Sequence, residues 1–133
     1  FDTVQATWNL LEISAGDALN EAHERGMGVI IKEGVANGRL TSRNDTQDFT
    51  AQRRLLNTQA ERLNTTLDAF ALAGVLAQPG VDVVLSGAAT VEHFKSNAAA
   101  LDVSWDEEAT EAVAEIIEPP EIYWDIRSNL DWN

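Results

Sequence analysis

The sequence predicts an α/β fold in which about three parallel strands carry flanking helices. Short apolar segments alternate with longer segments of helical periodicity, and two apolar segments are uninterrupted, as in strands buried on both faces. Turn residues separate these segments. A three-stranded parallel sheet leaves two edges and an incompletely covered face. We therefore expect that partner material completes the sheet or that the sheet belongs to a larger barrel.

The first part of the chain predicts two strands with a helix between them. Residues 2–9 alternate apolar and polar side chains, which is typical of a strand. Residues 17–25 have apolar side chains at helical spacing, and Gly26 follows, a residue favoured just after a helix C-terminus. Residues 29–31 form a short apolar strand that runs into Lys32.

The middle of the chain predicts a polar connection, two helices and a third strand. Residues 36–50 are polar and rich in turn signals, so we expect a loop or lid. Helical periodicity follows over residues 51–63 and 66–77. Residues 81–85 are apolar and predict the last strand.

A sharp turn at residues 86–88 joins this strand to a helix over residues 90–101. Such a turn can bind an anion, because backbone N–H groups and the helix dipole point at the ligand. The pattern from Ser104 to Glu107 resembles a capping box, in which Ser caps and Glu reaches back, and it predicts a helix to about residue 117.

The chain ends in a tail that is rich in aromatic residues. Two prolines at residues 119–120 end the preceding helix, and we assign residues 118–133 to the tail of a unit that spans residues 1–133. Tyr123, Trp124 and Trp132 either line a substrate pocket or pack on the sheet. The first residue, Phe1, is not Met, which suggests a fragment or a processed chain.

Composition limits the classes of partner. The net charge of -13 argues against nucleic acid and anionic membrane surfaces, and no apolar run approaches the roughly 20 residues that cross a bilayer. The absence of Cys removes thiol chemistry and favours a reducing compartment, so we expect a cytoplasmic protein. Its acidic, lysine-poor surface fits a salt-adapted cytoplasm or an acidic mesophilic protein. Asp106, Glu107 and Glu108 favour a helix N-terminus over a metal site.

Four segments, in order along almost the whole chain, resemble the C-terminal half of an aldo-keto reductase. They are VQATWNLLE (residues 4–12), GVIIKEGVANGRLT (28–41), LAQPGVDVVLSGAATVEHFKSNAAAL (76–101) and PPEIYWDIRSNLDW (119–132). The resemblance implies the C-terminal half of a (β/α)8 TIM barrel. It also implies an NAD(P)H-dependent oxidoreductase that reduces small aldehydes or ketones to alcohols.

The resemblance also implies a cofactor site. Gln5 would bind the nicotinamide carboxamide, and Asn97 would lie near the adenine amine. The pyrophosphate would be lined by Lys32, Glu33, Val35 and Gly38, and the adenosine end by Ser86, Gly87, Ala88, Thr90, His93 and Asn97.

Two positions depart from the family pattern. Lys32 stands where many members have an aromatic residue that stacks on the nicotinamide. Gly87 and His93 stand near positions where many members hold the 2′-phosphate of NADP with a Lys or Arg, and Lys95 could substitute. NADP and NAD both remain candidates. For Lys32 the alternative role is a salt bridge at the barrel edge, and for Asn97 it is a polar residue facing solvent.

No catalytic residue is predicted in this chain. The family's catalytic Asp, Tyr, Lys and His come from the first half of the barrel, and the single tyrosine, Tyr123, lies far along the tail. We therefore expect the chain alone to be inactive. The alternative from another class is a non-enzymatic half-barrel that self-associates to close its sheet, or a nucleotide-binding module.

Overall fold

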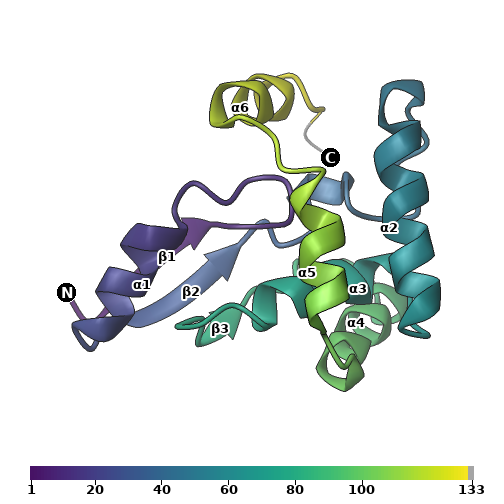
Figure 1. The fold of residues 1–133 in the computed structure, drawn as a ribbon. Coiled ribbons are helices and arrows are strands. Elements are labelled where there is room, and N and C mark those ends of the chain that lie inside the picture. The colour runs from purple at the N-terminus through teal and green to yellow at the C-terminus, as the bar shows by residue number, and fades with distance from the viewer. Residues whose placement is uncertain (132–133) are drawn as a thin grey trace.

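The computed structural model describes residues 1–131 and builds them around one sheet (Figure 1). Within these residues there are three strands, six α-helices and three short 3₁₀ turns. In chain order they are β1 (Thr3–Thr7), α1 (Gly16–Glu24), β2 (Gly28–Lys32), η1 (Ala36–Gly38), η2 (Gln47–Phe49), α2 (Thr50–Arg62), α3 (Leu67–Leu76), β3 (Val83–Val84), α4 (Val91–Ala98), η3 (Ala99–Asp102), α5 (Glu107–Ala114) and α6 (Pro120–Ser128).

The sheet is parallel throughout, in the order β1-β2-β3. Gln5 aligns with Ile30, and Ile30 aligns with Val83. Helix α1 connects the first two strands, and η1, η2, α2 and α3 lie between the second and the third. The predicted α/β fold with three parallel strands is confirmed. The third strand is shorter than expected, although Leu85 N–H still donates to the Ile31 carbonyl beyond its end at 2.9 Å.

The two faces of the sheet differ sharply in burial. One face carries Val29 and Ile31, which are 1% and 0% exposed and belong to the main core. That core includes side chains from α1, α3 and α5, such as Leu19, Phe70 and Val113. Side chains alternate between the two faces of a strand, so the intervening residues point the other way.

The opposite face of the sheet is largely bare. Val83 and Leu85 are 48% and 44% exposed, Gln5 and Lys32 are exposed, and Ile30 is half-buried. A sheet face lined by apolar side chains is usually covered in a complete domain. The chain therefore has the burial pattern of a sheet whose second face is left open within residues 1–131.

The start of α5 differs from the sequence-based expectation. The N-cap is Asp106, whose Oδ1 accepts the Ala109 N–H at 2.9 Å, and not Ser104. Glu107 is therefore the first helical residue and does not reach back as a capping-box residue would. Asp106 has a second partner that explains the shift, because its carboxylate also binds the Arg62 guanidinium of α2 at 2.7 and 2.8 Å.

The aromatic tail contains a helix, α6, that was not predicted from the sequence. Pro120 occupies the first turn of α6, where its missing N–H is not needed. Tyr123 is fully buried and belongs to the main core, while Trp124 is 42% exposed. Trp132 lies outside the described residues. Helix α6 lies above the loops that follow β1 and β2 (Figure 1).

The polar segment between β2 and α2 contains the two short turns η1 and η2. Phe49 and Leu40 of this segment are buried in the main core at 4% and 0% exposure. Within residues 1–131, no helix has the length and apolar character needed to cross a membrane.

Candidate functional site

The predicted cofactor residues form two turns and one patch on the bare sheet face. The first turn, residues 33–38, follows β2 and carries Glu33, Val35 and Gly38. The second turn, residues 86–90, follows β3 and leads into α4. Both turns leave the carboxyl ends of neighbouring parallel strands, which is the edge where ligands bind in such sheets.

Gln5 and Lys32 lie on the bare face of the sheet. Lys32 aligns with Thr7, two residues beyond Gln5, so both side chains point to the same side. Both are exposed, and Lys32 makes no ion pair with any residue of the described part of the chain. Its ammonium group is available for an anion.

The turn after β2 has an unusual backbone. Glu33, Ala36 and Asn37 all have left-handed conformations, with φ of 57°, 51° and 54°. Such conformations cost about 1–3 kcal/mol each for residues other than glycine. They persist only where surrounding contacts hold them, so the contacts of this turn decide its shape.

Glu33 is the point at which these contacts meet. Its carboxylate accepts hydrogen bonds from Arg127 Nη2 at 2.7 Å and from Asn37 Nδ2 at 3.1 Å. The Tyr123 hydroxyl lies 3.5 Å from the same carboxylate, and the Glu33 carbonyl accepts from Asn9 Nδ2 at 3.0 Å. The sequence-based prediction gave Glu33 a place beside the pyrophosphate. In the structure its side chain is held by α6.

Further buried contacts hold the segment that leads into α6. Arg39 donates to both carboxylate oxygens of Glu118 at 2.9 and 2.6 Å, and the two side chains are only 10% and 14% exposed. The Arg39 guanidinium also lies 5.5 Å from the ring centroid of Phe49 and 5.8 Å from that of Tyr123. These contacts fix the connection to α6 against the turn after β2.

The Tyr123 hydroxyl is part of this network. It accepts a hydrogen bond from Asn9 Nδ2 at 3.0 Å. Burial raises the pKa of Tyr123 to about 12 because the phenolate would lose its hydration. A hydroxyl with that pKa and no exposure is a poor proton donor to a substrate, so it is a structural group.

The turn after β3 is built differently. Gly87 has φ of 62°, a conformation that glycine adopts without strain. Thr90 caps α4, since its Oγ1 accepts the His93 N–H at 3.1 Å. The N–H groups of Ala88, Ala89 and Thr90 donate no hydrogen bond within residues 1–131. These groups fit an anion at a helix N-terminus.

Asn97 ties this turn to α4. Its Nδ2 donates to the Ser86 carbonyl at 2.9 Å and to Ser86 Oγ at 3.0 Å. A carbonyl oxygen can only accept, so the group that faces it must be the NH2 of Asn97. Both donors are thereby used, and the acceptor Oδ1 is left for another donor. Asn97 is half-buried and is not a polar residue facing only solvent.

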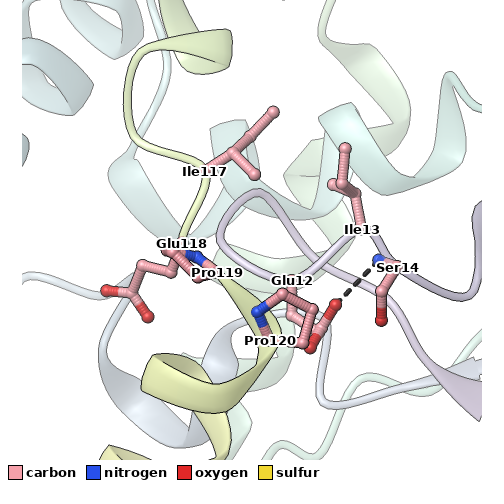
Figure 2. A pocket seen from close by; sticks show the side chains of 7 residues that line it. All are labelled: Glu12, Ile13, Ser14, Ile117, Glu118, Pro119 and Pro120. Carbon is pink, nitrogen blue, oxygen red and sulfur yellow. Dashed lines mark hydrogen bonds between the residues drawn. The ribbon is translucent and has the colours of Figure 1, made fainter.

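A groove of about 440 Å³ lies beside the connection between α5 and α6. Figure 2 shows its lining, with the Glu12 carboxylate accepting the Ser14 N–H at 2.7 Å. Its lining residues are Glu12, Ile13, Ser14, Ile117, Glu118, Pro119 and Pro120. None of the predicted cofactor residues lines this groove. In the part of the chain that the structure describes, no group of three potential metal ligands occurs.

The residues that hold the first turn were not predicted from the sequence as part of the site. Tyr123 and Arg127 lie four residues apart and face the same neighbour, as residues on one side of a helix do. A spacing of four residues is consistent with two side chains on one face of a helix. Their partner is 90 and 94 residues away, and no local pattern indicates such a contact.

Comparisons with known proteins agree with this architecture. The model of the aldo/keto reductase family matches residues 1–118. Aldo-keto reductase AKR11C1 from Bacillus halodurans has a TM-score of 0.71 and 19% identity in its apo form, covering 89% of this chain and 44% of that chain. Its holo form has a TM-score of 0.70 and 20% identity, with 87% and 42% covered.

A third structure, the thermostable aldo-keto reductase Tm1743 in complex with the inhibitor epalrestat, has a TM-score of 0.68. It shares 20% identity, and the match covers 84% of this chain and 38% of that chain. The chain thus spans about two fifths of the length of these structures. A search of curated proteins gives no significant match.

These structures are TIM barrels, and the three parallel strands correspond to part of such a barrel. The resemblance to the aldo-keto reductase family is confirmed, and the family model covers the first three of the four sequence segments. Because the family model covers residues 1–118, the chain belongs to the aldo/keto reductase family.

Proposed function

We propose that this chain supplies the cofactor-binding part of an NAD(P)H-dependent aldo-keto reductase that reduces small aldehydes or ketones to alcohols. The arrangement of Asn97 and Ser86 is the observation that carries the proposal. It leaves one acceptor, Asn97 Oδ1, on the same helix whose N-terminal side carries the free N–H groups of Ala88, Ala89 and Thr90. This pair of features matches the donor amine of adenine and the anionic phosphate of the same cofactor.

The adenosine end of the cofactor is proposed to lie against the turn after β3. Ser86, Gly87, Ala88, Thr90, His93 and Asn97 would surround it. Gly87 supports a close approach, because a Cβ added there would meet no atom within 4 Å and the backbone needs a positive φ. The exposed Lys95 on α4 is the proposed cation for a 2′-phosphate, which favours NADP over NAD.

The pyrophosphate and nicotinamide are proposed to extend toward β2 and β1. Lys32 would neutralise phosphate charge beside Val35 and Gly38. Gln5 would bind the nicotinamide carboxamide, because an amide side chain can both donate to and accept from another amide. When bound, the cofactor supplies the hydride for carbonyl reduction. The residues of this chain hold and orient it.

We assign no catalytic residue to this chain. Tyr123 is buried, its pKa is raised to about 12, and it is the single tyrosine of the sequence. The acid that protonates the carbonyl oxygen would come from another part of the intact enzyme. We therefore propose that residues 1–133 alone, a half-barrel with a tail from about residue 118, reduce no carbonyl substrate, and that the intact enzyme works in the cytoplasm.

A self-associating half-barrel is the second candidate. The bare sheet face with Val83 and Leu85 about half exposed favours it, because a second copy could cover that face. A dimer that forms without nucleotide, and that NADPH neither stabilises nor dissociates, would support this alternative. Sedimentation with and without NADPH separates the two candidates.

Titration of the chain with NADPH tests the leading proposal. We expect saturable but weak binding, together with carbonyl reduction no faster than the background. Reduction above background would contradict the assignment of catalysis to another part of the enzyme. The encoding gene offers an independent check: an upstream segment with an Asp-Thr-Ala-like motif, Tyr, Lys and His supports an enzyme, whereas a start codon next to Phe1 argues against it.

A further inference from the structure

We propose that Arg127 of α6 makes the turn after β2 compatible with an anionic dinucleotide, by neutralising and holding the Glu33 carboxylate. The inference rests on the proposed function, because it concerns the pyrophosphate end of the same site. Arg127 is a positioning residue in this account and does not itself contact the cofactor.

The charge problem arises from the position of Glu33. It directly follows Lys32 at the end of β2, on the turn proposed to line the pyrophosphate. An unpaired carboxylate there would repel the cofactor's phosphates. Salt screens this repulsion only partly between charges that lie within one Debye length of each other, which is about 10 Å at 0.1 M salt. The net charge of -13 adds to the repulsion.

The structure provides a partner that neutralises the Glu33 carboxylate. Arg127 Nη2 lies 2.7 Å from Glu33 Oε1, and the two side chains are 20% and 11% exposed. The Glu33 hydrogen bond raises the pKa of Arg127, so the guanidinium remains charged. The same carboxylate accepts from Asn37 Nδ2, which spans the turn from its first residue toward its end. The ion pair thus removes the charge, while the Asn37 hydrogen bond, which a glutamine oxygen at residue 33 can also accept, spans the strained turn.

The two halves of this ion pair should have opposite effects when they are replaced. Arg127→Ala leaves a negative charge beside the proposed phosphate site. Glu33→Gln leaves a positive charge there. A pair that only stabilised the fold would weaken binding in both variants. The sign of the change in affinity therefore separates an electrostatic positioning role from a merely structural one.

The experiment measures NADPH affinity in the full chain and in four variants, with hydrogen exchange of residues 33–38. Arg127→Ala should weaken NADPH binding about tenfold, and the deficit should shrink as salt is added. Glu33→Gln should bind as well as the wild type or about twofold more tightly. Arg127→Lys, which keeps the charge, should retain most of the affinity. Residues 33–38 should exchange faster in Arg127→Ala.

Arg25→Ala is the matched control, because it removes an exposed arginine that pairs with Glu21 on α1. It should leave both readouts unchanged. Wild-type affinity in Arg127→Ala, or equal weakening in Glu33→Gln and Arg127→Ala, would overturn the inference while leaving the proposed function in place. If Arg127→Ala does not fold, weakened binding in Glu33→Gln still overturns it. Failure of the wild type to bind NADPH would overturn the proposed function, and this inference with it.

Discussion

The turn after β2 contains three non-glycine residues in left-handed conformations, and buried contacts from α6 hold it. The turn after β3 reaches its shape through Gly87 and is tied mainly by one side chain, Asn97. Both turns leave the same edge of one sheet. The first is fixed by distant parts of the chain, and the second is fixed locally.

This difference has a consequence for ligand binding. A turn held by long-range contacts is organised before the ligand arrives, so little ordering cost remains on binding. The exposed turn after β3, with its free N–H groups, has fewer constraints and should be ordered further by a ligand. The proposed site therefore has a rigid pyrophosphate end and an adaptable adenosine end.

The largest effect is expected at Tyr123, the fully buried residue of α6. Tyr123→Ala removes a fully buried ring and should lower the free energy of unfolding by about 3–5 kcal/mol. Phe94→Ala on α4 is the matched control, because that ring is 60% exposed and should contribute less than about 1 kcal/mol. Chemical denaturation measures both. Similar losses in the two variants would contradict the contrast between the regions.

Alkaline titration tests the burial of the Tyr123 hydroxyl. The pKa of Tyr123 is raised from 10.0 to about 12, chiefly by burial. Its folded value lies above its unfolded value, so this contribution to stability is complete below pH 10 and is lost as the pH rises toward 12. Tyr123 is the single tyrosine, so phenolate absorbance reports on it alone. A midpoint near 10 in the folded protein would show that the ring is solvated.

Asn97→Asp tests the hydrogen bonds between Asn97 and Ser86 that hold the turn after β3. An aspartate has nearly the same shape but donates no hydrogen bond, and its charge would face the Ser86 carbonyl. NADPH affinity should fall about tenfold, while residues 33–38 should exchange as in the wild type. Asn57→Ala, at an exposed position of α2, is the control. Faster exchange in both turns would mean that they are not independently held.

The smallest effect is expected outside both turns, at the start of α5. The Arg62 guanidinium holds the pKa of Asp106 at about 2, below its ordinary 3.8. The folded value is depressed, so the stabilisation is present above about pH 4 and is lost as the pH falls toward 2. Asp106→Asn should lower the thermal midpoint slightly at neutral pH and lose this acid dependence. An unchanged acid profile would contradict the assignment.

Much of the fold could be predicted because its signals are local. The apolar run at residues 29–31 and the alternation in residues 2–9 indicated the first two strands. Errors occurred where two signals competed. Ser104 fitted a capping box, but Asp106 has both the better acceptor and the Arg62 partner, and it became the cap. Helix α6 was not predicted, because two successive prolines are typical of a helix end, whereas Pro120 begins this helix.

The parts of the candidate site also differ in whether local sequence signals could predict them. The turn at Ser86 and the residue Asn97 were visible because strand, glycine and helix follow one another within a few residues. The contacts of Glu33 with α6 were not visible, because they join residues about 90 positions apart. Such contacts depend on the packing of the whole chain.

Hydrogen exchange with and without NADPH tests the central claim most directly, which is that the two turns are the two ends of one cofactor site. NADPH should slow exchange in residues 33–38 and in residues 86–97 together, with the larger change in the second segment. Helix α2, away from both turns, should remain unchanged. Protection of only one segment, or of neither at saturating NADPH, would contradict the account.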